Sequence, residues 1–431
     1  AKVPAFVRNV SKTHMYQQYA VADVGQDMPK LSRSTIFELI SMLTTGQELL
    51  LSQTDLATVK LVHENLHRAE RMIIQFIANP QEQKYMLRMK AVLANFLENQ
   101  YIQHAVKESG DVEHSHSLSY GLNISKEHAL RNQARCNACR LVPYFFSKLK
   151  DHVRTTLIVH EDVSTESLLK QVEVLHGNTQ AYMAHKIRTA NQQVALLDLH
   201  QEMKHQCENE RNTAPKDVII VAGFKQNFTP GARLHKNEPS RRSICWHACM
   251  LIWYQYNPLT FKADRQAVFC DQIVRDTVEK DESAGIILLE ALFTQLKRDF
   301  PSVQNIILQT NCSVAYNSRS FAAALPLLAR HVGLNIHRHI TSEVSCLTGV
   351  LGLHVAQASQ IVETYLAGGK CESVSPEQVY AALSQQATSN NSSCQLLHIN
   401  KEKLNSFFTM CSSLIARLPP YQRYYDVEYQ F

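Results

Sequence analysis

Three groups of residues have the types and spacing that chemistry requires, and the first is HENLH. Here His63 and His67 lie four residues apart, with Glu64 next to His63. On a helix both imidazoles share one face, which is the zinc-protease pattern with the glutamate as base. Polar Asn65 and charged Arg68 surround the motif and no third ligand is evident. A solvated helix face is therefore the better interpretation.

The second group is a Cys-x-x-Cys pair with histidines upstream. Two thiolates at this spacing can hold one tetrahedral zinc ion, and two histidines can complete the site. A structural zinc is the favoured interpretation, and two buried thiols with surface histidines are the alternative. The candidate ligands are His116, His128, Cys136 and Cys139, and His114 is a further histidine of the same segment.

The third group is Cys245, His247 and Cys249, at positions i, i+2 and i+4. In a strand these side chains share one face, so they could ligate a metal. Cysteine also packs as a small hydrophobe, and a core face is the favoured interpretation. The chain contains no G-x-x-x-x-G-K and no G-x-S-x-G, which argues against nucleotide hydrolysis and serine hydrolysis.

Length and composition limit the class of protein. The 431 residues are enough for two or three domains, and the net charge of +5 permits nucleic-acid contact without requiring it. Eleven scattered cysteines favour a reducing compartment. No run of 18 apolar residues and no secretory signal are present, so we expect no membrane partner. The predicted location is intracellular, with the nucleus favoured over organelle or cytoplasm.

The chain divides by its hydrophobic periodicity. Amphipathic repeats predict a mostly helical N-terminal region over 1–110 and a second helical block over 146–212, on either side of the His/Cys segment 111–145. Residues 213–400 instead alternate short β-branched runs with helical patterns, which predicts a mixed α/β sheet. A C-terminal helix and an aromatic tail are expected over 401–431. The tail is expected to dock as a terminal strand, with base stacking as the alternative.

Within 213–400 the expected strands lie in APKDVIIVAGF, RRSICWHACMLIWYQY (a strand or a hairpin), VQNIILQT and LNIHRHI. The expected helices lie in SAGIILLEALFTQLKRDF, SFAAALPLLARHVG, LTGVLGLHVAQASQIVETYLAGG and SPEQVYAALSQQ. The stretch SQQATSNNSS is expected to be a polar loop.

Several of these segments resemble motifs of DDE/D cut-and-paste DNA transposases. VIIVAGFKQNF resembles a first core strand of the type VIVMDFKMKF, and RRSICWHAC resembles RGISWHG. LQTNCSVAYN resembles LQSDNAxCYxN, and SEVSCLTGVLGLHVA resembles SEAQSGKDxCDxHFA. The start of the helix at RSTIF, the His/Cys segment and YMAHKIR are similar too. The resemblance spans most of the chain and implies an RNase H-like core over 213–400.

The resemblance places neutral residues where the family has its three metal-binding acids. Gly223, Asn311 and Gly352 stand at these positions. Two-metal catalysis needs carboxylates, and Asp217 and Glu343 are not expected to replace them. The resemblance therefore implies a pseudoenzyme without a catalytic metal.

The preferred function is nucleic-acid binding, to DNA or RNA, by a transposase-derived protein. A basic segment beside the former active cleft would contact phosphates; its members are Lys225, Arg233, Lys236, Arg241 and Arg242. A solvated loop is the alternative for these residues. The alternative functions are a scaffold subunit of a larger ribonucleoprotein or organellar assembly, and an active nuclease or HExxH protease.

Overall fold

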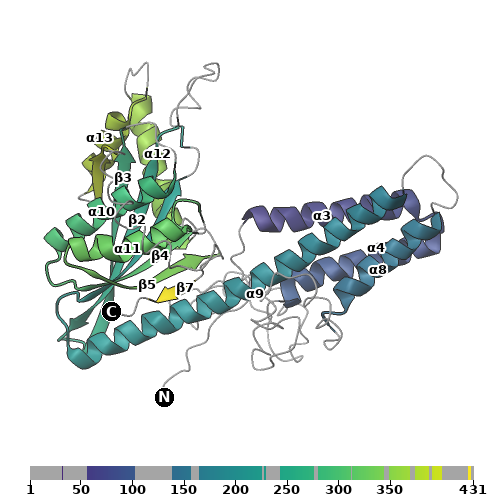
Figure 1. The fold of residues 1–431 in the computed structure, drawn as a ribbon, viewed down its shortest axis with the longest axis horizontal. Coiled ribbons are helices and arrows are strands. Elements are labelled where there is room, and N and C mark those ends of the chain that lie inside the picture. Colours follow the sequence, from purple (N-terminus) through teal and green to yellow (C-terminus); the bar gives the residue numbers. More distant parts are fainter. Residues whose placement is uncertain are drawn as a thin grey trace. The chain divides into compact units, whose positions relative to one another are not determined.

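The computed structural model describes residues 32, 56–101, 138–156, 165–225, 228–229, 243–275, 280–311, 313–343, 349–368, 374–387, 391–399 and 426–428. The chain forms two compact units, Ala1–Leu196 and Leu197–Phe431 (Figure 1). The division falls inside one long helix, α9 (Thr165–Glu210), and lies N-terminal to the start of the α/β segment at 213.

The first unit is helical in its described part. It contains α3 (Leu56–Phe76), α4 (Pro80–Asn95), the π-helix η1 (Phe96–Gln100), α8 (Leu141–Thr156) and the first part of α9. Asn79 caps α4, because its side chain accepts hydrogen bonds from the backbone N–H groups of Gln81 and Glu82. Apolar side chains of α3, α4, α8 and α9 form one buried cluster.

The second unit is built on a seven-stranded mixed sheet of order β6-β3-β2-β1-β4-β5-β7. Antiparallel pairs join β1 to β2, β2 to β3 and β5 to β7, and parallel pairs join β1 to β4, β4 to β5 and β3 to β6. The strands are β1 (Asp217–Lys225), β2 (Trp246–Asn257), β3 (Lys262–Val274), β4 (Asn305–Asn311), β5 (Asn335–Ser342), β6 (Ser392–Leu397) and β7 (Asp426–Glu428).

One face of this sheet carries the hydrophobic core under α10 (Glu282–Asp299) and α11 (Arg319–His331). We call it the packed face. Asp281 and Ser318 cap the two helices through their side-chain oxygens. Gly285 of α10 lies so close to the loop after β4 that an added Cβ would stand 2.7 Å from the carbonyl oxygen of Ala315. Glycine is therefore required at this contact.

The opposite face carries α12 (Gly349–Gly368), and we call it the α12 face. The Lys225 amine at the end of β1 donates to the Ser359 hydroxyl of α12 at 2.6 Å. The helix α13 (Pro376–Ala387) follows α12 in the chain and joins it around a shared cavity. The end of α9 reaches this face as well, because a ring nitrogen of His200 lies 3.2 Å from the Tyr254 hydroxyl.

The structure confirms a mixed α/β protein with a helical N-terminal region. Each expected strand and helix of 213–400 is present, and β7 pairs with β5 as a terminal strand. The prediction of a polar loop over 384–393 is wrong at both ends. Helix α13 continues to Ala387, and β6 begins at Ser392 because the edge of β3 offers it backbone partners. No helix in the described ranges is long and apolar enough to cross a membrane.

Candidate functional site

The ends of β1 and β4 bring two of the expected acid positions together. The last aligned pair of these parallel strands is Ala222 with Thr310, so Gly223 and Asn311 follow side by side. Neighbouring strands lie about 4.8 Å apart. Ala222 belongs to the core of the packed face, and residues alternate between faces. Gly223 and Asn311 therefore belong to the α12 face.

Gly352, the third expected position, is half-buried on α12. It lies two helical turns before Ser359, on the same side of the helix. Because Ser359 accepts from Lys225 of β1, this side of α12 is turned toward the strand that carries Gly223. All three positions thus belong to one face of one sheet and to the helix that covers it.

The chemistry available at these positions is that of a single neutral amide. Asn311 Oδ1 is buried and has no hydrogen-bond partner within the described ranges. Asp217 lies at the other end of β1, where Asn305 Nδ2 donates to its carboxylate at 2.6 Å. Glu343 follows the end of β5. No group of three His, Cys, Asp or Glu residues suited to a metal occurs among the residues that the structure describes.

A buried carboxylate does lie on the α12 face, two strands away from Gly223. The register runs from Gly223 through Ala248 to Asp271, which is 3% exposed. Its carboxylate accepts from Trp246 Nε1 at 2.8 Å and lies 2.8 Å from His354 Nε2. Each oxygen thus contacts a protein group, and the contact with His354 links β3 to α12.

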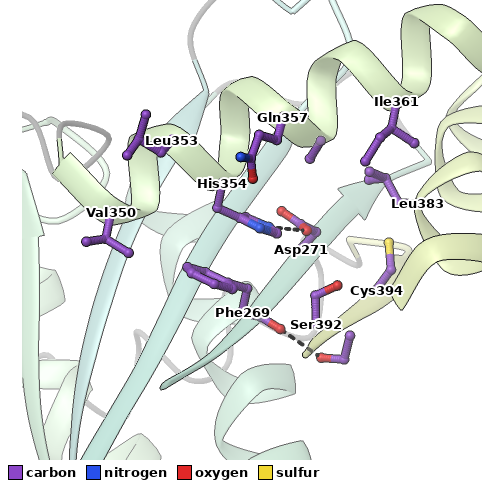
Figure 2. A pocket seen from close by; sticks show the side chains of 12 residues that line it. Phe269, Asp271, Val350, Leu353, His354, Gln357, Ile361, Leu383, Ser392 and Cys394 are labelled. Carbon is purple, nitrogen blue, oxygen red and sulfur yellow. Dashed lines mark hydrogen bonds and ion pairs between the residues drawn. The ribbon is translucent and has the colours of Figure 1, made fainter. Parts of the chain in front are cut away.

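The His354–Asp271 pair helps to line a cavity of about 330 Å³ between α12, α13, β3 and β6 (Figure 2). The Phe269 ring stacks on the imidazole with 4.1 Å between centroids and an angle of 2°. Around this polar pair the lining is mainly apolar; it includes Val350, Leu353, Ile361 and Leu383. The cavity is therefore suited to apolar side chains or an apolar ligand body.

The described part of the basic segment is Lys225, and this residue is held inside the unit. Besides its bond to Ser359, its amine lies 5.1 Å from the centre of the Phe228 ring and 5.4 Å from that of Trp246. Burial lowers the pKa of this amine. Arg233, Lys236, Arg241 and Arg242 lie outside the described residues.

The HENLH residues lie on α3, where His63, Glu64 and His67 are all exposed. His63 Nε2 is 3.2 Å from a Glu98 oxygen, and His67 Nδ1 is 3.3 Å from a Glu70 oxygen. The two imidazoles therefore face two different carboxylates, as on a solvated helix face.

The candidate zinc ligands divide between described and undescribed parts of the chain. Cys139 is 1% exposed at the turn before α8, whereas His116, His128 and Cys136, with the nearby His114, lie outside the described residues.

The Cys245, His247 and Cys249 group lies in the core, as predicted. All three are buried, and burial lowers the pKa of His247 to about 4. A ring nitrogen of His247 is 2.6 Å from Gln272 Oε1, and no metal is needed to satisfy this group.

Sequence reasoning missed the pairing of Asp271 with His354. His354 was part of a transposase-like motif, but Asp271 lies 83 residues away in β3, and no local spacing links them. The strand register that aligns Asp271 with Gly223 was the missing information.

Comparison with protein-family models, with curated proteins and with solved structures gives no match to this chain.

Proposed function

We propose that this chain is a catalytically inactive, transposase-derived protein with an RNase H-like core, retained for nucleic-acid binding. The observation that carries the proposal is the pair Gly223 and Asn311 at the adjoining ends of β1 and β4, under a helix that carries Gly352. In the transposases that the chain resembles, carboxylates at these three positions hold the two metal ions. These positions supply one neutral amide oxygen.

The strand arrangement supports an RNase H-like core. Its central part has the order β3-β2-β1-β4-β5, with β2 antiparallel to both neighbours and β1, β4 and β5 parallel. Helix α10 connects β3 to β4, α11 connects β4 to β5, and α12 follows β5. This is the topology that the transposase resemblance implies, and β6 and β7 extend it at its edges.

The positive charge near the former cleft supports nucleic-acid binding. Lys225 ends β1 two residues after Gly223, and the four arginine and lysine residues of 233–242 come 8 to 17 residues later in the chain. Because Lys225 is bound to Ser359, we assign phosphate contact to the four residues that follow. Phosphate contacts release counterions, so binding should weaken steeply with salt.

Fluorescence anisotropy with labelled single-stranded and duplex DNA and RNA, at several salt concentrations, tests this function. We expect the variant with Arg233, Lys236, Arg241 and Arg242 changed to Gln to lose affinity. Its slope of log K against log salt should fall by up to about 0.9 for each lost contact to duplex DNA. The matched control changes the exposed Arg71, Arg88, Lys262 and Arg265 to Gln. No salt-sensitive affinity for any of the four nucleic acids would contradict the proposal.

A structural zinc is proposed for the His/Cys segment. The buried position of Cys139 fits a thiolate ligand shielded from water. Metal analysis of the purified full chain should find about one zinc per chain, and Cys136→Ser should remove it whereas Cys371→Ser should not. Wild-type protein without zinc would contradict this part of the proposal.

A scaffold role remains the second candidate, and one observation favours it. Leu259 and Phe261, at the turn between β2 and β3, are 88% and 75% exposed. The turn is ordered by Asn257, whose side chain accepts from Leu259 N–H and donates to Asp264. If Leu259→Glu released a protein that co-purifies with the wild-type chain, the scaffold role would be supported.

A further inference from the structure

Helix α12 is apolar on more than the side that packs against the sheet. Its twenty residues contain one acidic side chain, Glu363, and no lysine or arginine. The inner side is buried through Leu351, Val355, Ala358, Val362 and Leu366. A helix that is apolar around most of its circumference is normally covered on all sides. On its outer side, away from the sheet, α12 has exposed apolar residues.

The open side carries a regular row of residues, which we call the outer stripe: Val350, Leu353, Gln357, Ile361 and Thr364. Val350 is 50% exposed and Leu353 is 65% exposed. The steps of three and four residues are those of the contact seam between two paired helices.

Two cavities lie along the outer stripe. The first, of about 330 Å³, is lined by Val350, Leu353 and Leu383 (Figure 2). The second, of about 590 Å³, is lined by Thr364, Tyr365 and Ala382. Both contain Gln357 and Ile361, so they adjoin at the middle of the stripe. They provide holes on either side of Gln357 into which side chains of a packed helix can insert.

We propose that the outer stripe binds the same stripe of a second copy of this chain, antiparallel and about a two-fold axis at Gln357. The spacing is symmetric about that residue. Val350 lies seven residues before Gln357 and Thr364 lies seven residues after it. Leu353 lies four residues before Gln357 and Ile361 four residues after it. An antiparallel pair therefore matches Val350 with Thr364, Leu353 with Ile361, and Gln357 with itself, which is the self-complementarity of an isologous contact.

The charge distribution favours a second copy as the occupant. No charged side chain belongs to the outer stripe, so two copies meet without like-charge repulsion. Glu363 is half-buried and lies close enough to favour the charged form of Lys225 on the sheet side. The Gln357 amides can donate and accept across the axis, and a polar residue at the centre of a helix seam fixes register.

The interface is small. Stable complexes bury about 800 Å² on each partner, and one pair of helices with the rim of α13 supplies less than that. We therefore expect a reversible dimer with a Kd in the micromolar range. This inference does not depend on the proposed function.

Sedimentation velocity on the full chain, from about 1 to about 200 µM, tests the proposal. We expect wild-type protein to shift from monomer to dimer across this range and Leu353→Glu to remain a monomer. Leu259→Glu, an exposed leucine away from α12, is the matched control and should dimerise normally. Circular dichroism checks that each variant is folded. A wild-type chain that stays monomeric, or a dimer that survives Leu353→Glu, would overturn the proposal.

Charge substitutions test the antiparallel register. Val350 and Thr364 are both exposed, so Val350→Lys and Thr364→Glu should leave the fold intact while each weakens the dimer several-fold. In the antiparallel pair the introduced lysine of one copy faces the introduced glutamate of the other. The double variant should therefore dimerise more tightly than either single variant. High salt should remove this difference, because it screens the new ion pairs. A parallel pair would place lysine against lysine and glutamate against glutamate. A double variant that dimerises less well than either single variant would overturn the register.

Discussion

The packed face and the α12 face of the same sheet both contain paired polar side chains, but the three expected acid positions belong to the α12 face alone. On the packed face, Gln272 accepts from His247 and donates to the Leu288 carbonyl and Gln395, and Thr310 pairs with His339. Trp253 Nε1 is an exception without a partner in the described part of the chain. On the α12 face, the position of Gly223 has no side chain and Asn311 Oδ1 has no partner there.

The difference indicates which features the fold requires. The packed face needs close packing and paired polar groups, because a buried unpaired group costs stability. The α12 face is held by the His354–Asp271 and Lys225–Ser359 contacts, and neither uses the three acid positions. Neutral residues at the three expected acid positions are therefore compatible with this fold.

Of the substitutions considered, one in the core of the packed face should lower the free energy of unfolding most. Phe293 is fully buried in the cluster under α10, and Phe293→Ala should lower the free energy of unfolding by about 3–5 kcal/mol. Urea unfolding followed by circular dichroism measures this. A loss below about 1 kcal/mol would mean that this face is not closely packed.

Acid should weaken the packed face through His247. Burial lowers its pKa to about 4 from an ordinary value of 6.5. Between these values the unfolded chain binds the proton and the folded chain does not, so stability falls as pH decreases from 6.5 toward 4. The slope is at most about 1.4 kcal/mol per pH unit for this group.

Urea unfolding between pH 7 and pH 5 measures that slope, and His247→Gln should reduce it. The control is Gln81→Ala on α4, an exposed side chain that does not ionise, so its slope should match that of the wild type. Because His176 and His200 also have a pKa lowered to about 4 by burial, some acid sensitivity should remain in His247→Gln. Equal slopes in the wild type and His247→Gln would show that the folded protein takes up a proton at His247.

Removing a buried polar side chain from the packed face should lower the free energy of unfolding by an intermediate amount. Gln272→Ala removes the hydrogen bonds that this side chain makes to the His247 ring, to the Leu288 carbonyl and to Gln395, at a cost of about 1–3 kcal/mol. The measurement is again the midpoint of urea unfolding, at pH 7.

A substitution on the α12 face should change the free energy of unfolding least. Asn311→Ala removes an amide whose oxygen has no partner in the described ranges, so the free energy of unfolding should change by less than about 0.5 kcal/mol. A loss as large as that of Gln272→Ala would abolish the contrast between the two faces.

The sequence alone predicted the helices and strands whose apolar pattern is strong. The runs in β1 and β4 and the periodicity in α10 and α11 predicted each element. It was insufficient for β6, because Ser392, Ser393 and Gln395 have weak strand signals and the strand exists through its pairing with β3. It did not predict β3 at all, since the half-exposed middle of this strand gives no clean alternation.

Only those residues of the candidate site that belong to a recognisable sequence motif could be predicted. Gly223, Asn311 and Gly352 were identified from a resemblance, and the strand register was needed to show that the first two are neighbours. The Asp271–His354 contact and the outer stripe depend on which side of α12 faces the sheet. Periodicity alone does not reveal that when apolar residues lie on more than one side of a helix.

Manganese binding tests the central claim, that the metal-binding acids are absent, most directly. Isothermal titration of the full chain with Mn²⁺, with electron paramagnetic resonance to count bound ions, should detect no pair of ions in the wild type beyond the zinc segment. The variant Gly223→Asp, Asn311→Asp, Gly352→Asp should gain Mn²⁺ binding, because it restores a carboxylate at each position. Two Mn²⁺ ions bound by the wild-type chain, and lost on Asn311→Ala, would contradict the account.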